Sequence, residues 1–141
     1  MEDDVRALFQ RYVETFNRGL QGEDVSVETS EYFASEFIAS VPAGVHTGKN
    51  GASFRQSMAV GYQRYREQGF DSMVHGGVRA ILIDDCHSLA FVEWTASYLK
   101  NGSVVSIPFT NCYFLRRDDR LSIIGWVAGD EEAELKKYGI S

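Results

Sequence analysis

Two residues, Asn101 and Gly102, constrain the fold of this 141-residue chain more than any other feature. They separate two runs in which apolar and polar side chains alternate, and both residue types adopt the positive φ angles of a type I′ turn. A hairpin turn of two residues sets the register of the strands that it joins, so Trp94 is expected to lie opposite Phe109. The same register places Asn111 opposite Val92.

This register predicts one strongly aromatic sheet face, because successive side chains of a pleated strand point to opposite faces. A second tight turn at Asp118-Asp119 extends the face to the next strand and places Tyr113 opposite Ile124. In that register, Asn111 lies opposite Trp126. The predicted inner face carries Ala90, Val92, Trp94, Ala96, Tyr98, Ile107, Phe109, Asn111, Tyr113, Ile124 and Trp126. The opposite face is half polar and carries Phe91, Glu93, Thr95, Ser97, Ser106, Thr110, Cys112 and Phe114.

Pro108 interrupts the second run of the hairpin. Proline has no N–H to donate to a β-ladder, so its position suggests a bulge, which would turn every later residue to the other face. The inward position of Asn111 depends on the absence of such a bulge. A buried amide without partners costs about 1–3 kcal/mol, so Asn111 is expected to bond to protein, water or ligand.

The first half of the chain has helical periodicity. One apolar stripe, at i, i+3, i+4 and i+7 spacing, consists of Val5, Leu8, Phe9, Tyr12, Val13 and Phe16. A second helix is expected from Asn50 or Ser53, with Phe54, Met58, Tyr62 and Tyr65 on its stripe and Gly69 as its C-cap glycine.

The remaining segments are expected to be shorter elements. Residues 23–31 should form a loop and residues 32–35 a helical turn, followed by a strand over 36–41 that ends at Pro42. Further strands are predicted at 72–83, 88–99, 104–116 and 121–128, with a last short helix at 130–138.

Together these elements predict an α+β fold, in which a curved antiparallel sheet wraps around N-terminal helices as a cone. The length fits a single domain over residues 1–141. The open end of such a cone is a natural pocket for a small apolar ligand. Its expected lining is Phe16, Phe37, Val41, Met58, Trp94, Phe109, Tyr113 and Trp126.

The composition and the charge of the chain exclude some classes of binding partner. The net charge is −6, which argues against nucleic acid because phosphate binding requires a basic surface. Apolar runs such as Ala80-Ile81-Leu82-Ile83 are too short to span a membrane, and the acidic start Met1-Glu2-Asp3-Asp4 does not look like a signal peptide. A cytoplasmic protein is therefore expected. No nucleotide-binding glycine motif or spaced set of metal ligands occurs, so neither a cofactor nor a metal is predicted.

Several segments resemble the nuclear-transport-factor-two-like superfamily, which includes SnoaL-like and ketosteroid-isomerase-like proteins. They are Arg11 to Asn17, Phe37 to Gly44 followed by His46-Thr47-Gly48, Ala90 to Gly102, and Tyr113 to Arg117. The resemblance implies the cystatin-like α+β cone fold, and it implies a homodimer formed through the sheet face. It does not specify a function, since this fold hosts enzymes, ligand binders and scaffolds.

The resemblance to ketosteroid isomerase suggests where catalytic groups could lie. The helix tyrosine of that enzyme matches Tyr12, and its second acidic residue falls near Asn111, both of which could donate to an oxyanion. Its catalytic base would stand at Val41, so the base is missing. His46, expected in a loop near the cone mouth, is the replacement base to consider, with an ordinary pKa of about 6.5.

Three functions remain open on these grounds. The first is a binding protein for a small hydrophobic or aromatic molecule. The second is an isomerase, cyclase or dehydratase that uses His46 as base, with Tyr12 and Asn111 as oxyanion donors. The third is a non-catalytic homodimeric interaction module that uses the half-polar sheet face.

Overall fold

The computed structural model describes residues 1–140, which form helices packed against a six-stranded sheet. The helices of this part of the chain are α1 (Glu2–Leu20), α2 (Ser26–Ser30), α3 (Ala52–Glu67) and α4 (Glu131–Lys137). The strands are β1 (Phe33–Val41), β2 (Gly44–Lys49), β3 (Phe70–Leu82), β4 (His87–Lys100), β5 (Ser103–Arg117) and β6 (Leu121–Val127).

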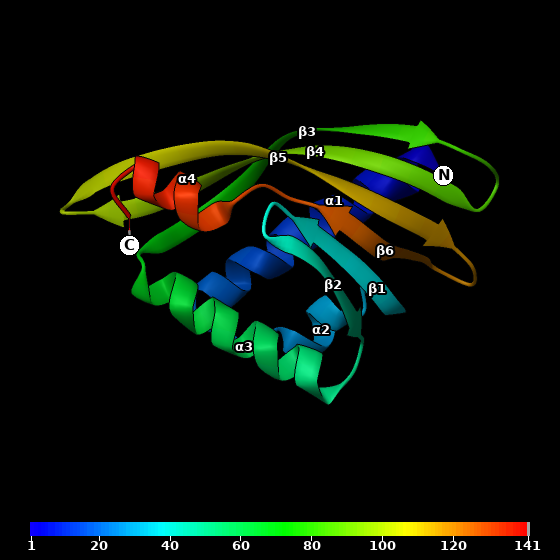
Figure 1. Ribbon diagram of the computed structural model, residues 1–141, viewed down its shortest axis with the longest axis horizontal. Helices are drawn as coiled ribbons and strands as arrows, with labels where there is room; N and C mark the ends of the chain where they lie inside the picture. Colours follow the sequence, from blue (N-terminus) through cyan, green and yellow to red (C-terminus); the bar gives the residue numbers. More distant parts are fainter. Residues whose placement is uncertain (141) are drawn as a thin grey trace.

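The sheet has the strand order β2-β1-β6-β5-β4-β3. Neighbouring strands are antiparallel except β1 and β6, which run parallel. The long strands β3, β4 and β5 arch over α1 and α3, and α4 lies at the end of the sheet where the β4–β5 hairpin projects (Figure 1). The predicted α+β cone, with a curved sheet around N-terminal helices, is therefore confirmed.

The β4–β5 hairpin has the predicted turn and register. Asn101 and Gly102 have φ angles of 50° and 78°, which are the left-handed values that this turn requires. Trp94 pairs with Phe109, and the pairing continues without a shift to Asn111 opposite Val92. The local sequence therefore determines which side chains of these two strands face the helices.

The bulge suggested by Pro108 does not occur, because Pro108 pairs with Thr95 in an uninterrupted ladder. The other side of the β5 backbone is unpaired at this point, since β6 pairs with β5 only between Cys112 and Arg117. A proline at such an edge removes no ladder bond.

The predicted register between β5 and β6 was wrong. The turn contains three residues, 118–120, and the pairing shifts between Phe114 and Leu115, so Tyr113 lies opposite Trp126 and not Ile124. The Arg120 side chain reaches back to backbone carbonyl oxygens of Glu31 and Phe33, a contact that the local sequence does not reveal.

The longer turn and the shift between Phe114 and Leu115 each displace the pairing of β5 with β6 by one residue. Trp126 therefore keeps its predicted face, whereas the buried position expected for Ile124 belongs to Ile123, which is 0% exposed. Asn111 lies beyond the last residue of β5 that pairs with β6, so the expected pairing of Asn111 with Trp126 is wrong as well.

The segment between α1 and α3 also differs from the prediction. Residues 23–31 contain the short helix α2, and residues 33–35 belong to β1 instead of a helical turn. Phe33 begins β1 because its ring is buried, and the preceding Tyr32 shares a 2.8 Å hydrogen bond with Thr15 of α1. The expected loop around His46 is the strand β2, which pairs with β1.

The hydrophobic core forms where α1 meets the inner face of the sheet. Phe9 is fully buried, and its ring centroid lies 4.7 Å from that of Tyr113 and 6.3 Å from that of Trp94. Burying side chains of this size is the main source of folding free energy. At the end of α3, Gly69 adopts a φ of +85° and ends the helix as predicted. In residues 1–140 no helix combines the length and the apolar composition of a membrane span.

Candidate functional site

The centre of the inner face is a hydrogen-bonded group around Tyr113. The Trp94 indole N–H donates to the Tyr113 hydroxyl oxygen at 3.1 Å, and the Asn111 amide donates to the same oxygen at 3.3 Å. Because this oxygen already accepts two hydrogen bonds, its own O–H is left to act as a donor. The sequence analysis predicted Tyr113 only as part of the apolar pocket lining. It did not predict that the Tyr113 hydroxyl is the shared acceptor at the centre of this group.

Asn111 lies on the inner face, as the hairpin register predicts. It is half-buried, and its bond to Tyr113 explains how a partly buried amide is tolerated. Among the described residues, no group donates to its side-chain carbonyl oxygen. Within residues 1–140, only Thr29 and His75 have a side-chain polar atom that is both fully buried and without a hydrogen-bond partner. The unpartnered Asn111 oxygen is not among these atoms, so it retains some contact with solvent.

Tyr12 approaches the same group from α1. Its ring centroid lies 6.0 Å from that of Trp94 and 5.7 Å from that of Tyr32. Burial, followed by the neighbouring tyrosines, raises the pKa of Tyr12 well above its usual value, and burial likewise raises the pKa of Tyr113. Both phenols therefore remain protonated in the neutral range and act as donors.

The Tyr12 hydroxyl and the Trp126 indole N–H are two further hydrogen-bond donors on the inner face. Neither has a hydrogen-bond partner in the part of the chain that the structure describes, and neither is among the fully buried atoms that lack one. Both groups therefore reach accessible space while their rings pack against the inner face.

A ring cluster borders this group on the side of β1 and β6. Phe37 stacks on Trp126 at 5.5 Å, and Phe54 of α3 lies 4.6 Å from Phe37 between centroids. These three side chains are only half-buried. The other residues of the predicted lining are distributed around them: Phe16, Val41, Met58 and Phe109 are half-buried, and Trp94 and Tyr113 are buried.

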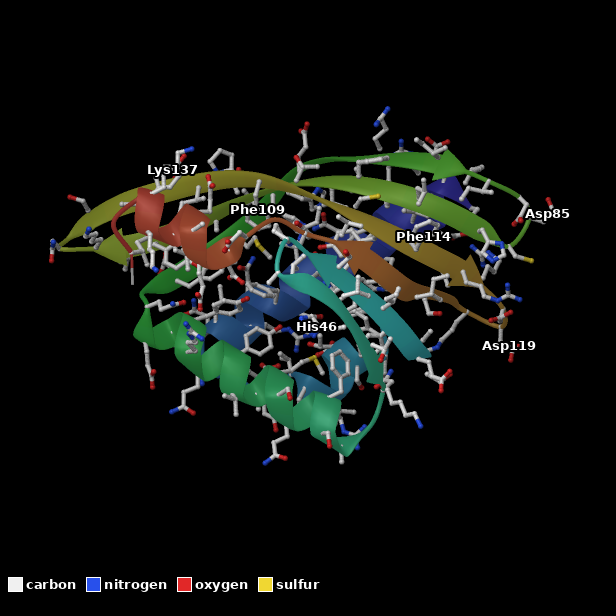
Figure 2. The ribbon with its side chains drawn as sticks, in the orientation of Figure 1. His46, Asp85, Phe109, Phe114, Asp119 and Lys137 are labelled. Carbon is white, nitrogen blue, oxygen red and sulfur yellow. The ribbon has the colours of Figure 1, made fainter. Side chains whose placement is uncertain are left out.

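His46 stands apart from the other predicted catalytic residues. It pairs with Ala39, so it lies on the same side of the β1–β2 hairpin as Phe37 and Val41. Figure 2 shows His46 on this hairpin. The imidazole is exposed, and within residues 1–140 it makes no hydrogen bond or ring contact with Tyr12 or Asn111. The structure thus joins Tyr12 and Asn111 through Trp94 and Tyr113 and leaves His46 outside this group.

Glu131, in the first turn of α4, is an acidic group that the sequence analysis did not select. Its side chain accepts a 3.4 Å hydrogen bond from the Tyr65 hydroxyl of α3. Burial raises the pKa of Glu131, against the opposing effects of Tyr65 and Arg64. Its sequence context, an acidic run that begins a helix, carries no signal of proximity to the inner face.

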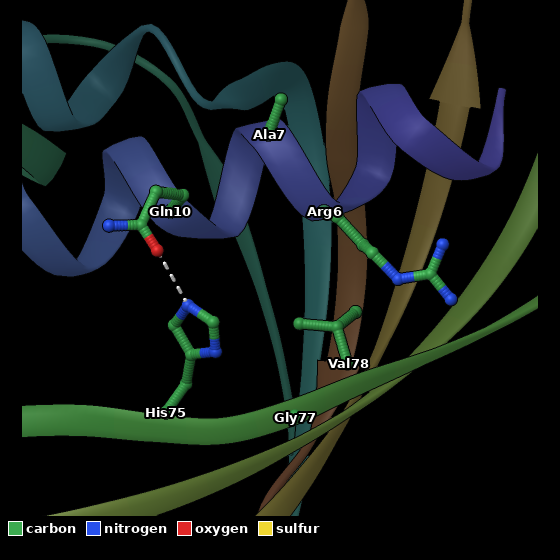
Figure 3. A pocket seen from close by; sticks show the side chains of 6 residues that line it. All are labelled: Arg6, Ala7, Gln10, His75, Gly77 and Val78. Carbon is green, nitrogen blue, oxygen red and sulfur yellow. Dashed lines mark hydrogen bonds between the residues drawn. The ribbon is translucent and has the colours of Figure 1, made fainter.

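Two hollows open on the outside of the molecule. One lies between α1 and β3, where the Gln10 side chain and His75 share a 3.0 Å hydrogen bond (Figure 3). The other lies between the end of α1 and the start of β3 and is lined by polar residues. Neither hollow includes a predicted site residue. Across residues 1–140, no cluster of three or more histidine, cysteine or acidic side chains could hold a metal ion.

Comparison with known proteins places this geometry in context. A family model described as NTF2-like protein (DUF6841) matches residues 2–131. An NTF2-like protein with a cystatin-like fold from Novosphingobium aromaticivorans has a TM-score of 0.72 at 14% identity, covering 93% of this chain and 82% of that one. No curated protein is significantly similar to the chain.

Two further structures agree with that fold. An NTF-2 like protein of unknown function from Shewanella oneidensis has a TM-score of 0.69 at 13% identity, covering 92% of this chain and 98% of that one. A ketosteroid isomerase-like protein from Erwinia carotovora has a TM-score of 0.62 at 14% identity, covering 90% and 93%. At such identities the likeness establishes the fold alone.

Proposed function

The chain belongs to the NTF2-like family DUF6841, and from its inner face we infer that it binds a small, largely apolar molecule carrying a hydrogen-bond acceptor. The observation that carries this proposal is the set of accessible donors among half-buried rings. Tyr12 and Trp126 each present a polar hydrogen without a partner in residues 1–140, and Tyr113 has an O–H left to donate.

The apolar part of the ligand would lie against the ring cluster. Phe37 stacks on Trp126 and packs at a tilt against Phe54, and all three rings remain partly accessible. Pockets for small molecules combine such apolar walls with a few placed polar groups. A flat aromatic or alicyclic body fits this surface, and a carbonyl oxygen fits the donors.

The polar part of the ligand would contribute oxygen acceptors. Tyr12, Tyr113 and Trp126 offer neutral donors, and the overall charge of −6 does not favour an anionic ligand. We therefore expect a neutral carbonyl compound. Its oxygen would accept from the Tyr12 and Tyr113 hydroxyls, and the Asn111 carbonyl oxygen would remain for a water or a ligand hydroxyl.

Binding of 2-acetylnaphthalene, an aromatic body with one carbonyl, tests the proposal. Ligand-observed NMR should show saturable binding to the wild type, and Tyr12→Phe should weaken it by roughly five- to ten-fold, the effect of one hydrogen bond. Because the Tyr12 hydroxyl has no partner in residues 1–140, this substitution should leave the free energy of unfolding unchanged.

Thr110→Val is the control, because Thr110 neighbours Asn111 on the exposed outer side of β5. Its affinity should equal that of the wild type. Failure of the wild type to bind this probe, or any of a panel of steroids, polyketides and aromatic carbonyl compounds, would contradict the proposal.

An enzymatic role is the second candidate, favoured by the position of His46 on the same side of the hairpin as Phe37. His46 would take a proton from the carbon next to a ligand carbonyl. The electron pair of that C–H bond would form the enolate, whose oxygen would accept from Tyr12 and Asn111. The enolate would then regain a proton from the imidazolium, at the same or another carbon.

The same NMR samples in D2O test this step. Deuterium should enter the methyl group of 2-acetylnaphthalene in the presence of wild type, and His46→Ala should abolish the incorporation while retaining the binding. Binding without any incorporation by the wild type would exclude this assignment of His46.

Homodimerisation through the outer face of the sheet is a separate proposal. The described helices leave this face uncovered, and Ile38, Phe114 and Val127 there are exposed by 47%, 43% and 53%. Exposed apolar side chains that lie on neighbouring strands are typical of an interface.

A further inference from the structure

Glu131 places a carboxylate next to tyrosines from two elements of the cone. The Tyr65 hydroxyl of α3 donates to Glu131 Oε2 at 3.4 Å. The pKa of Tyr98, on the inner side of β4, is raised first by burial and then by the charge of Glu131, so the carboxylate lies within electrostatic reach of this phenol. Figure 1 shows α4 at the end of the sheet toward which α3 runs.

This carboxylate is both sheltered and reachable. Nearby protein atoms raise the pKa of Glu131, while the residue as a whole is exposed. These two observations agree if the carboxylate lies at the open end of the cone, with protein on one side and solvent on the other. A group in this position is accessible to a ligand and interacts strongly with it, because water screens it less than a free surface charge.

Most of its hydrogen-bonding capacity is unused. A carboxylate accepts about four hydrogen bonds. Within residues 1–140, Glu131 receives the single long bond from Tyr65, and its Oε1 receives none. The Tyr98 hydroxyl also lacks a hydrogen-bond partner in this range, and the Tyr98 side chain is only 2% exposed. The neighbouring Glu132 differs, because it is paired with Arg64 at 3.4 Å.

We propose that Glu131, together with Tyr65 and Tyr98, forms a second recognition point that accepts the hydroxyl group of an apolar ligand. The proposal rests on the proposed function and extends it. The carbonyl end of the ligand would meet the donors at Tyr12 and Tyr113, and a hydroxyl at its other end would meet the acceptor on α4. The substrate class is then an apolar carbonyl compound that also bears a hydroxyl group.

Two probes with the same ring system separate this inference from the proposed function. They are 2-acetylnaphthalene and 6-hydroxy-2-acetylnaphthalene, which adds only the hydroxyl. The wild type should bind the hydroxylated probe roughly ten- to 100-fold more tightly, the effect of a hydrogen bond to a charged group. In Glu131→Gln most of this preference should disappear, whereas the affinity for the first probe should stay unchanged.

Glu132→Gln is the matched control, since it removes a charge from the same turn of α4 and should preserve the preference. The pH profile supplies a second readout. The groups that face Glu131 are Arg64 and Tyr65 from α3, Tyr98 from β4 and Glu132 from α4 itself. The preference of the wild type should increase as pH rises through the pKa of Glu131, and that of Glu131→Gln should not.

The outcomes are distinguishable. If the wild type binds both probes equally, or if Glu131→Gln retains the preference, this inference is overturned and the proposed function stands. If the wild type binds neither probe, the proposed function fails for this ring system and the inference fails with it.

Discussion

Gly19, in the last turn of α1, shows how one residue determines the packing of two helices. A Cβ atom at this position would stand 2.5 Å from Cε1 of the buried Tyr62 ring of α3. The hydrogen of glycine is thus what allows Tyr62 to lie against α1. The periodic pattern of the helix does not reveal this requirement, since Gly19 looks like part of a helix end in the sequence.

Gly19→Ala is therefore expected to destabilise the protein. Overpacking against a buried ring costs about 1–3 kcal/mol, which exceeds the gain of about 0.5–1 kcal/mol from replacing glycine within a helix. Urea unfolding monitored by circular dichroism would measure the change.

Gly61→Ala is the matched control in α3. A Cβ atom there meets nothing within 4 Å, so only the helix-propensity gain applies and the variant should be more stable by about 0.5–1 kcal/mol. Equal effects of the two substitutions would show that the Tyr62 ring moves aside without cost.

At the scale of elements, α4 is attached to the rest of the fold by a few side chains. Leu135 and Ile140 are buried, and Arg64 and Tyr65 of α3 contact Glu132 and Glu131. The helix begins at Asp130, whose side chain accepts a 3.0 Å hydrogen bond from the Ala133 N–H. The sequence predicts a short helix over residues 130–138, but the contact with α3 requires the tertiary structure.

Because α4 carries Glu131, it should make stability depend on pH. The folded-state pKa of Glu131 is raised above its usual value of 4.5, so the folded protein binds the proton more tightly than the unfolded chain. The contribution of this group is fully present below the unfolded pKa and is lost as pH rises through the folded pKa.

Glu131→Gln removes that dependence. Its stability relative to the wild type should therefore increase between about pH 4 and the neutral range. Thermal unfolding at a series of pH values would measure the difference, with Glu132→Gln as the control for loss of a charge from α4. A relative stability of Glu131→Gln that is constant over this range would contradict the expected direction.

At the scale of the whole molecule, the helices cover one face of the sheet and leave the other open. The open face carries Phe91, Cys112 and Phe114 among polar side chains, in the alternation that the hairpin register predicts. A stable interface buries about 800 Å² on each partner, and a face of several long strands is large enough to supply it.

Light scattering at micromolar concentration should accordingly give the mass of a dimer. Phe114→Asp should shift the protein toward the monomer, because it places a charge at the centre of the contact. Val60→Asp is the control, since Val60 is 62% exposed on α3 away from the sheet. A wild type that remains monomeric at these concentrations rules out this interface.

The sequence by itself determined the elements whose geometry depends on near neighbours. Asn101 and Gly102 specify their turn through their own backbone angles, so the register that turns Trp94, Phe109 and Asn111 inward follows from short-range chemistry. The apolar stripes of α1 and α3 and the glycine that ends α3 are local in the same sense.

Only the tertiary structure decided what depends on contacts between distant segments. The third residue of the β5–β6 turn is Arg120, whose side chain donates to the backbone carbonyl oxygens of Glu31 and Phe33, and the shift near Ile124 accompanies the pairing of β6 with both β5 and β1. The approach of Glu131 to Tyr65 joins residues that are 66 positions apart in the chain. The periodicity of a sequence reports the spacing of side chains along one strand or helix. It carries no information about which side chains from distant segments come into contact.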